Sequence, residues 1–99
     1  MKKILLVCNA GMSTSMLVAK MKKAAQADGV EVSIEAKSLA DAKKEIQEAN
    51  IVLLGPQIRY ELENVKKLAG SVPVDAIDMR DYGMMHGEKV LKHAMEVMG

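Results

Sequence analysis

Two runs of four apolar residues constrain the fold of this chain more than any other feature. Residues 4–7 (Ile-Leu-Leu-Val) and residues 51–54 (Ile-Val-Leu-Leu) contain no polar side chain. Because side chains alternate between the two faces of a strand, a wholly apolar strand has to be covered on both faces. Such strands are typical of parallel sheets with helices on either side. We therefore expect both runs to be central, neighbouring strands.

The rest of the chain alternates between strand and helix patterns. Residues 30–37 alternate apolar with polar side chains, which predicts an edge strand with one wet face, and residues 73–77 predict a short fourth strand. Capping and turn residues predict helices from about residue 13 to 28, over 39–49, from 56 to 69 and at the C-terminus, with residues 78–87 as a loop. The side chains that we expect to face inward from these helices are Met16, Leu17, Met21, Ala24, Ala25, Leu39, Ala42, Ile46, Ala49, Ile58, Leu62, Val65, Ala69, Val90, Leu91, Ala94, Met95 and Met98.

Four strands separated by helices and short connections predict an α/β fold with a parallel sheet. Right-handed crossovers, with the two apolar strands inside, give a four-stranded parallel sheet of order 2-1-3-4 with helices on both faces. This architecture is flavodoxin-like and similar to that of low-molecular-weight phosphatases. Ligands of such sheets bind where the strand order reverses, beyond the carboxyl ends of the strands. Cys8 ends the first apolar strand and Gln57 follows the other, so we expect both at one crevice.

Length, charge and cysteine content narrow the classes of function. The 99 residues predict a single domain, residues 1–99, whose core is supplied by 49% hydrophobic residues. A net charge of +1 and only two aromatic residues argue against nucleic acid as a partner. One cysteine and nine methionines favour a reducing, cytoplasmic location. The apolar run near the N-terminus is too short for a signal peptide, and none approaches a ~20-residue membrane span, so no direct membrane insertion is expected.

Cys8 is followed by a stretch of small residues and then by residues that often start helices. Residues 9–11 (Asn-Ala-Gly) can turn tightly, and residues 13–15 (Ser-Thr-Ser) are favoured at helix starts. We therefore expect the sulfur to face backbone N–H groups and the positive end of a helix, which attracts anions and favours a thiolate. Six residues, 9–14, can wrap as a nest around three phosphoryl oxygens while sulfur attacks phosphorus in line. This arrangement needs no metal or cofactor.

The same combination of cysteine, loop and helix serves the low-molecular-weight tyrosine phosphatases, which need an arginine six residues after the cysteine. Thr14 occupies that position, so no guanidinium stabilises the charge of the transition state. Asp78 or Asp81 could act as a general acid, but the missing arginine suits a phosphoryl carrier better than a fast phosphatase. Two alternatives stay open. One is a thiol phosphatase or arsenate reductase, and the other is a module that binds a phosphate-bearing ligand without chemistry. A reductase would want resolving cysteines, which the chain lacks.

The segment that begins at Cys8 resembles a known family. Cys8 and residues 9–15 (Asn-Ala-Gly-Met-Ser-Thr-Ser) look like the phosphate loop of the enzyme IIB component, lactose/cellobiose class, of the bacterial phosphoenolpyruvate-dependent sugar phosphotransferase system. Residues 52–58 (Val-Leu-Leu-Gly-Pro-Gln-Ile) match as well, and Ile77-Asp78 and Tyr82-Gly83 match more weakly. The resemblance spans essentially the whole chain.

This resemblance implies a function and a set of partners. It implies a phosphocysteine at Cys8, a IIA protein carrying phosphohistidine as donor, and a membrane IIC permease that holds the sugar, with a β-linked disaccharide as the expected class. The IIB protein would be cytoplasmic and would reach the inner face of the membrane only through IIC. Residues 79–86 depart most from the family pattern, so no role is assigned there. The implied phosphate-binding loop consists of Asn9, Ala10, Gly11, Met12, Ser13, Thr14 and Ser15.

Several of these residues also fit ordinary structural roles. Residues 13–15 can serve only as helix caps, and Gln57 can be a solvated residue of a first helical turn rather than a contact of the phosphoryl group. His86 and His93 lack nearby cysteines or paired carboxylates, so no metal site is expected. The candidates for partner contacts, which fit equally well as packing or exposed side chains, are Met12, Arg59 and Tyr60.

Overall fold

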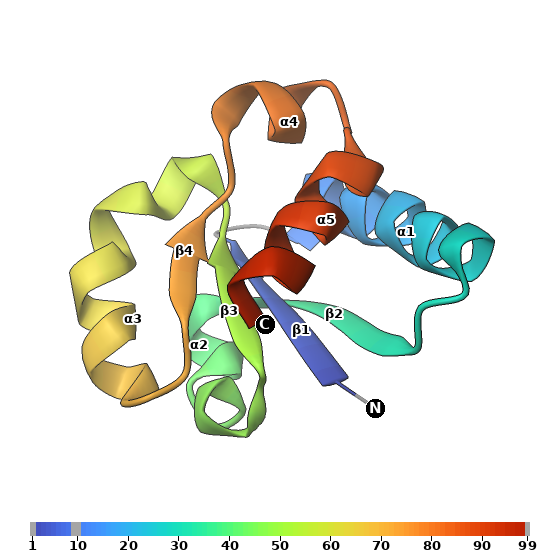
Figure 1. The fold of residues 1–99 in the computed structure, drawn as a ribbon. Helices are drawn as coiled ribbons and strands as arrows, with labels where there is room; N and C mark the ends of the chain where they lie inside the picture. The colour runs from blue at the N-terminus through green and yellow to red at the C-terminus, as the bar shows by residue number, and fades with distance from the viewer. Residues whose placement is uncertain (1, 9–10, 99) are drawn as a thin grey trace.

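A parallel four-stranded sheet forms the centre of the structure, a computed structural model that describes residues 2–8 and 11–98. The strand order is β2-β1-β3-β4, as predicted, with the two apolar strands side by side and β2 at an edge (Figure 1). Leu6 pairs with Ala36 on one side and with Leu53 on the other. The strands are β1 (Lys2–Cys8), β2 (Val32–Ser38), β3 (Ile51–Leu54) and β4 (Val74–Ala76).

Helices cover both faces of this sheet, which confirms the predicted fold class. The helix α1 (Gly11–Asp28) and the C-terminal α5 (Gly87–Met98) lie on one face, where they pack with Ile4 and Leu6 of β1 (Figure 1). The other face is covered by shorter pieces that pack with Leu5 and Val7. These pieces are α2 (Leu39–Ala42), the 3₁₀ segments η1 (Ile46–Glu48) and η2 (Pro56–Glu61), and α3 (Leu62–Ala69).

The residues that are buried in the two central strands are those that the sequence pattern predicted. All four residues of each apolar run are fully buried, and neighbours along each run belong to opposite cores. The edge strand β2 begins at Val32 rather than at residue 30, because the N–H of Val30 still completes the turn after α1 by donating to the Ala25 carbonyl. Within the part of the chain that the structure describes, no helix has both the length and the hydropathy that crossing a bilayer requires.

The first helix differs from its prediction in two ways. It begins at Gly11 instead of near Ser13, because a first turn can form without a serine cap, and sequence preferences leave such boundaries uncertain by one or two residues. The prediction that Met16 faces the core is wrong, since this residue is 60% exposed. The buried stripe instead runs through Leu17, Val18, Met21 and Ala25. Val18, which the pattern did not single out, takes the place expected for Met16.

The second and third predicted helices are broken, and one predicted loop contains a helix. After Ala42, the N–H groups of Glu45, Glu48 and Ala49 donate to carbonyls three residues back, so the chain tightens into turns and η1. Ile46 and Ala49 still reach the core as predicted. The segment after Pro56 is a 3₁₀ helix, and α-helical geometry starts only at Leu62. Residues 78–87, predicted to be a loop, contain the helix α4 (Met79–Gly83).

Candidate functional site

Cys8 is the last residue of β1, at the carboxyl edge of the sheet and three residues before the start of α1. Alternation along β1 puts its side chain on the same face as Ile4 and Leu6, the face that α1 and α5 cover. The residue is only 1% exposed. The first turn of α1 contains no acidic side chain, so nothing there neutralises the positive end of the helix. Such a first turn also leaves four N–H groups without a partner inside the helix.

The predicted phosphate loop, residues 9–15, falls into three parts in the structure. Asn9 and Ala10 lie outside the described residues. Gly11, Met12, Ser13 and Thr14 form the first turn of α1, so the helix begins two residues earlier within this segment than predicted. Ser15 is an exposed residue in the same helix. The backbone N–H groups that we expected to point at an anion are therefore, from Gly11 onward, those of a helix N-terminus.

The end of β3 closes directly against the end of β1. The N–H of Gly55 donates to the Val7 carbonyl at 2.8 Å, and Gly55 is buried. A Cβ atom built on Gly55 would lie 2.9 Å from Oε1 of Gln57 and 3.4 Å from Cβ of Cys8. The carboxamide of Gln57 and the carbon that carries the thiol therefore flank one point. The predicted proximity of Cys8 and Gln57 at the point where the strand order reverses is confirmed.

The two aspartates named as possible general acids stabilise α4 instead. Oδ1 of Asp78 accepts from the N–H groups of Arg80 at 2.8 Å and of Asp81 at 3.4 Å, so Asp78 is the N-cap. Oδ1 of Asp81 lies 3.2 Å from Nδ1 of His86, and the Asp81 carbonyl accepts from the His86 N–H. The sequence signal for this helix was present, because an aspartate at the cap with another three residues later is a start signature.

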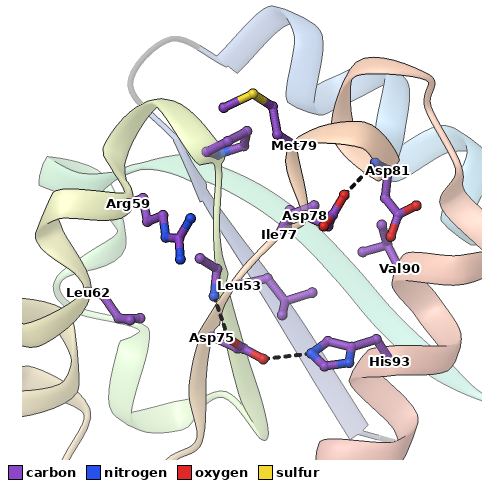
Figure 2. A pocket seen from close by; sticks show the side chains of 12 residues that line it. Leu53, Arg59, Leu62, Asp75, Ile77, Asp78, Met79, Asp81, Val90 and His93 are labelled. Carbon is purple, nitrogen blue, oxygen red and sulfur yellow. Dashed lines mark hydrogen bonds and ion pairs between the residues drawn. The ribbon is translucent and has the colours of Figure 1, made fainter.

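A cavity of about 430 Å³ opens beside β4, between the segment after β3 and the helix α5 (Figure 2). Figure 2 shows Arg59 on one side of it and His93 on the other, with Nε2 of His93 2.6 Å from Oδ2 of Asp75. Asp78 and Met79 line its upper end. Neither Cys8 nor Gln57 is among its lining residues, so this cavity is separate from the thiol. Tyr60, another of the candidates for partner contacts, is 75% exposed.

Charged side chains with shifted pKa values gather on the α2 side of the sheet. Hydrogen bonds from Lys37 and Lys3 lower the pKa of Glu45, and the bond to Glu45 raises the pKa of each lysine. Lys3 Nζ lies 3.0 Å from Oε1 of Glu45, while Lys37 pairs with the other oxygen. Among residues 2–8 and 11–98, no three His, Cys, Asp or Glu side chains are grouped so that they could hold a metal ion.

The sequence profile of the family described as "PTS system, Lactose/Cellobiose specific IIB subunit" matches residues 3–93, where PTS stands for phosphotransferase system. The chain belongs to this family. As a IIB protein it is similar over nearly its whole length to named PTS components. It is 44% identical to the oligo-beta-mannoside-specific EIIB component of Bacillus subtilis, over 99% of this chain and 97% of that one. It is 46% identical to the galactose-specific EIIB component of Lactococcus lactis subsp. cremoris, over 98% and 96% of the two chains.

Solved structures of IIB proteins share the fold. The solution structure of a cellobiose-specific IIB component from Borrelia burgdorferi superposes with a TM-score of 0.81 at 37% identity, covering 98% of this chain and 91% of that one. A lactose-specific IIB domain from Streptococcus pneumoniae also gives a TM-score of 0.81, over 96% and 95% of the chains. At 17% identity, this second likeness supports the flavodoxin-like fold alone.

Proposed function

We propose that this IIB protein is the phosphoryl carrier of a sugar phosphotransferase system, with Cys8 as the phosphorylated residue. The observation that carries the proposal is the position of Cys8, at the carboxyl end of a central strand and directly ahead of the N-terminus of α1. The first-turn N–H groups of α1 and its uncompensated positive end suit a dianionic phosphoryl group. Residues 9–15, with Cys8, form the proposed phosphate-binding segment.

The proposed chemistry consists of two phosphoryl transfers, one to Cys8 and one from it. The Cys8 thiolate attacks phosphorus of a phosphohistidine on a IIA protein, the S–P bond forms, and the P–N bond breaks with its electron pair returning to the imidazole. A sugar hydroxyl held by a membrane IIC protein then attacks phosphorus, loses its proton, and expels the thiolate. Because Thr14 stands where a thiol phosphatase has arginine, hydrolysis of the intermediate by water is slow in this proposal.

The names of the relatives support the class of sugar that we propose. Their names specify oligo-beta-mannoside, galactose and cellobiose, and we assign a β-linked disaccharide to the system served by this chain. The protein works in the cytoplasm and meets the membrane through IIC. Since Cys8 is 1% exposed, each transfer requires a local opening at the end of β1 that brings the sulfur to the partner.

Intact-mass measurement after incubation with a phosphohistidine-carrying IIA protein tests the proposal. We expect the wild-type protein to gain the mass of one phosphoryl group and Cys8→Ser, measured in parallel, to gain none. Asp41→Asn, which changes an exposed charge on α2, serves as the matched control and is expected to be phosphorylated normally. Phosphorylation of Cys8→Ser, or a wild-type protein that stays unmodified, would contradict the proposal.

The enzyme alternative is tested with an aryl phosphate. A carrier releases little product from such a substrate, because no guanidinium promotes attack by water. Sustained turnover that disappears in Cys8→Ser would identify a thiol phosphatase and overturn the carrier assignment.

A further inference from the structure

Gly55 is a glycine that the backbone does not require. Its φ of −61° and ψ of 149° are ordinary extended values that any residue adopts. The residue is nevertheless buried, with its N–H bound to the Val7 carbonyl. Since no unusual dihedral calls for glycine at this position, what the missing side chain provides is space.

The side chain of Gln57 occupies that space. Its Oε1 would lie only 2.9 Å from a Cβ on Gly55, closer than real Cβ contacts allow, whereas the distances to Cβ of Cys8 and the carbonyl of Val7, 3.4 Å and 3.6 Å, are ordinary contacts. Gln57 is otherwise exposed, at the start of a 3₁₀ segment from which it could extend into solvent. It folds back over the end of β3 instead, toward Cys8.

We infer that Gln57 contacts the phosphoryl group carried by Cys8, and that Gly55 is a positioning residue that leaves room for this contact. The inference rests on the proposed function. The terminal torsion of a glutamine is broad, so its carboxamide can present Nε2 as a donor to a phosphoryl oxygen without moving the backbone. Gln57 follows β3, while the helix α1 follows β1. The contact would therefore come from the end of the neighbouring strand β3, in addition to the helix N-terminus that follows β1.

An amide suits a carrier better than a cation would. A neutral N–H donor stabilises the phosphorylated thiol in its ground state, whereas a guanidinium would also stabilise the extra charge that develops when water attacks. Gln57 would thus bind the phosphoryl group without accelerating its hydrolysis in the way that the arginine of the phosphatases does. This role also predicts that a carboxylate of the same shape is harmful, because it repels the phosphoryl dianion.

The test is the equilibrium of phosphoryl transfer between a phosphohistidine-carrying IIA protein and this protein, measured by intact mass. Loss of a hydrogen bond to a charged group should lower the equilibrium constant about tenfold in Gln57→Leu. Gln57→Glu should lower it further. Gln26→Leu, the same substitution at an exposed site on α1, is the matched control and should leave it unchanged. A merely structural role would make Gln57→Glu resemble the wild type, and that result would overturn the inference.

A double-mutant cycle tests the role of Gly55. Gly55→Ala should lower the same equilibrium constant about as much as Gln57→Ala, because the new methyl group displaces the carboxamide. In the Gln57→Ala background, Gly55→Ala should add little, since the remaining neighbours are at ordinary contact distances. Additive losses in the two variants would refute this coupling. Gly83→Ala, at a helical glycine with open space around it, controls for the substitution itself.

These outcomes separate the two proposals. If wild-type Cys8 takes up no phosphoryl group, the proposed function has failed. If the wild type is phosphorylated and the Gln57 variants reach the same equilibrium, only the inference about Gln57 and Gly55 has failed. Thermal unfolding of each variant, measured in parallel, shows whether a lost phosphoryl group reflects a lost contact or a lost fold.

Discussion

The two faces of the sheet are covered in different ways. On the face that contains Ile4 and Leu6, two regular helices, α1 with 18 residues and α5 with 12, lie against the strands and against each other. Their contact is close at Gly87, where an added Cβ would lie 2.8 Å from backbone atoms of Lys20 and Met21. We therefore expect this face to be a rigid cover with little freedom to adjust.

The opposite face, which contains Leu5 and Val7, is covered by short pieces. Its helix α2 has 4 residues and η1 has 3, with turns between them, and α3 has 8. The charged cluster of Lys3, Lys37 and Glu45 lies over the polar side of β2. One sheet is thus covered by long helices on one side and by a mosaic of short helical pieces, turns and ion pairs on the other. The first cover should resist local collapse, and the second should tolerate change.

The largest effect on the free energy of unfolding should come from cavities made in the core on each face of the sheet. Leu6→Ala and Leu5→Ala each remove a fully buried side chain, and each should cost about 2–5 kcal/mol. We expect Leu6→Ala to cost more, because the long helices above it cannot close over the cavity, while the short pieces above Leu5 can shift. Urea unfolding measures both free energies of unfolding. Equal losses, or a larger loss in Leu5→Ala, would show that the two covers do not differ in rigidity.

The next effect should come from the close contact between α1 and α5. In Gly87→Ala the new methyl group forces the helices apart, which should cost about 1–3 kcal/mol, as overpacking usually does. Gly83→Ala is the control, because it adds the same atoms into open space and should change stability by about 0.5 kcal/mol or less. Thermal and urea unfolding report the difference. A tolerated Gly87→Ala would mean that the regular face adjusts as easily as the other.

A smaller effect is expected at the cap of α2 on the mosaic face. The Ser38 hydroxyl accepts from the Asp41 N–H at 3.3 Å, and Ser38→Ala should cost about 1 kcal/mol, as losses of N-caps do. Ser71→Ala, at an exposed turn serine, is the matched control and should cost less than half as much. If both variants are equally stable in urea unfolding, this one-turn helix does not depend on its cap.

The smallest effect should come from the charged cluster. Glu45→Gln removes the ion pairs with Lys37 and Lys3, and because these groups are solvent-accessible, we expect only a slight, salt-sensitive loss of stability at neutral pH. The folded-state pKa of Glu45 lies below its ordinary value, so its contribution is complete above about pH 4.3 and is lost as the pH falls through the folded pKa. Wild type and variant should therefore converge in stability in acid.

At alkaline pH, the contribution of this cluster to stability changes with pH in the opposite direction. The pKa values of Lys3 and Lys37 are raised, so their contribution is complete below the ordinary lysine value and disappears as the pH rises through the folded pKa values. Unfolding midpoints across pH, at low and high salt, measure this profile. A difference between wild type and Glu45→Gln that grows toward acid pH would contradict the assignment.

The successes of the sequence prediction lie in the strands and the failures in the helices. Unbroken apolar runs of this length are typical of central strands in parallel sheets, and all four residues in each run are buried. Gly29 and Gly70 end α1 and α3 with φ values of 68° and 64°, as turn chemistry predicts. The misjudged elements include α2 and α3, the broken helices of the mosaic face. The spacing of apolar residues cannot show whether a connection between two strands is a regular α-helix or a series of 3₁₀ turns, because both can bury the same residues.

The sequence also leaves open how α1 is rotated about its own axis, and therefore which of its side chains face the sheet. Met16, Leu17, Val18 and Met21 all offer apolar side chains within two turns, and the sequence does not say which of them face the sheet. Packing against the sheet and against the backbone of α5 near Gly87 selects the orientation, which buries Val18 and leaves Met16 exposed. The helix α4 is a different case, because its start signal, Asp78 with Asp81 three residues later, is present in the sequence but the helix has only 5 residues.

The sheet, its strand order and the position of Cys8 at a strand end are predictable from the sequence, because apolar runs and turn residues act locally. The burial of Cys8, and the way in which Gln57 folds back over Gly55 to lie beside it, depend on the tertiary structure. Residues so far apart in sequence are brought together by strand register, and the space that a glycine leaves has meaning only once its neighbours are in place.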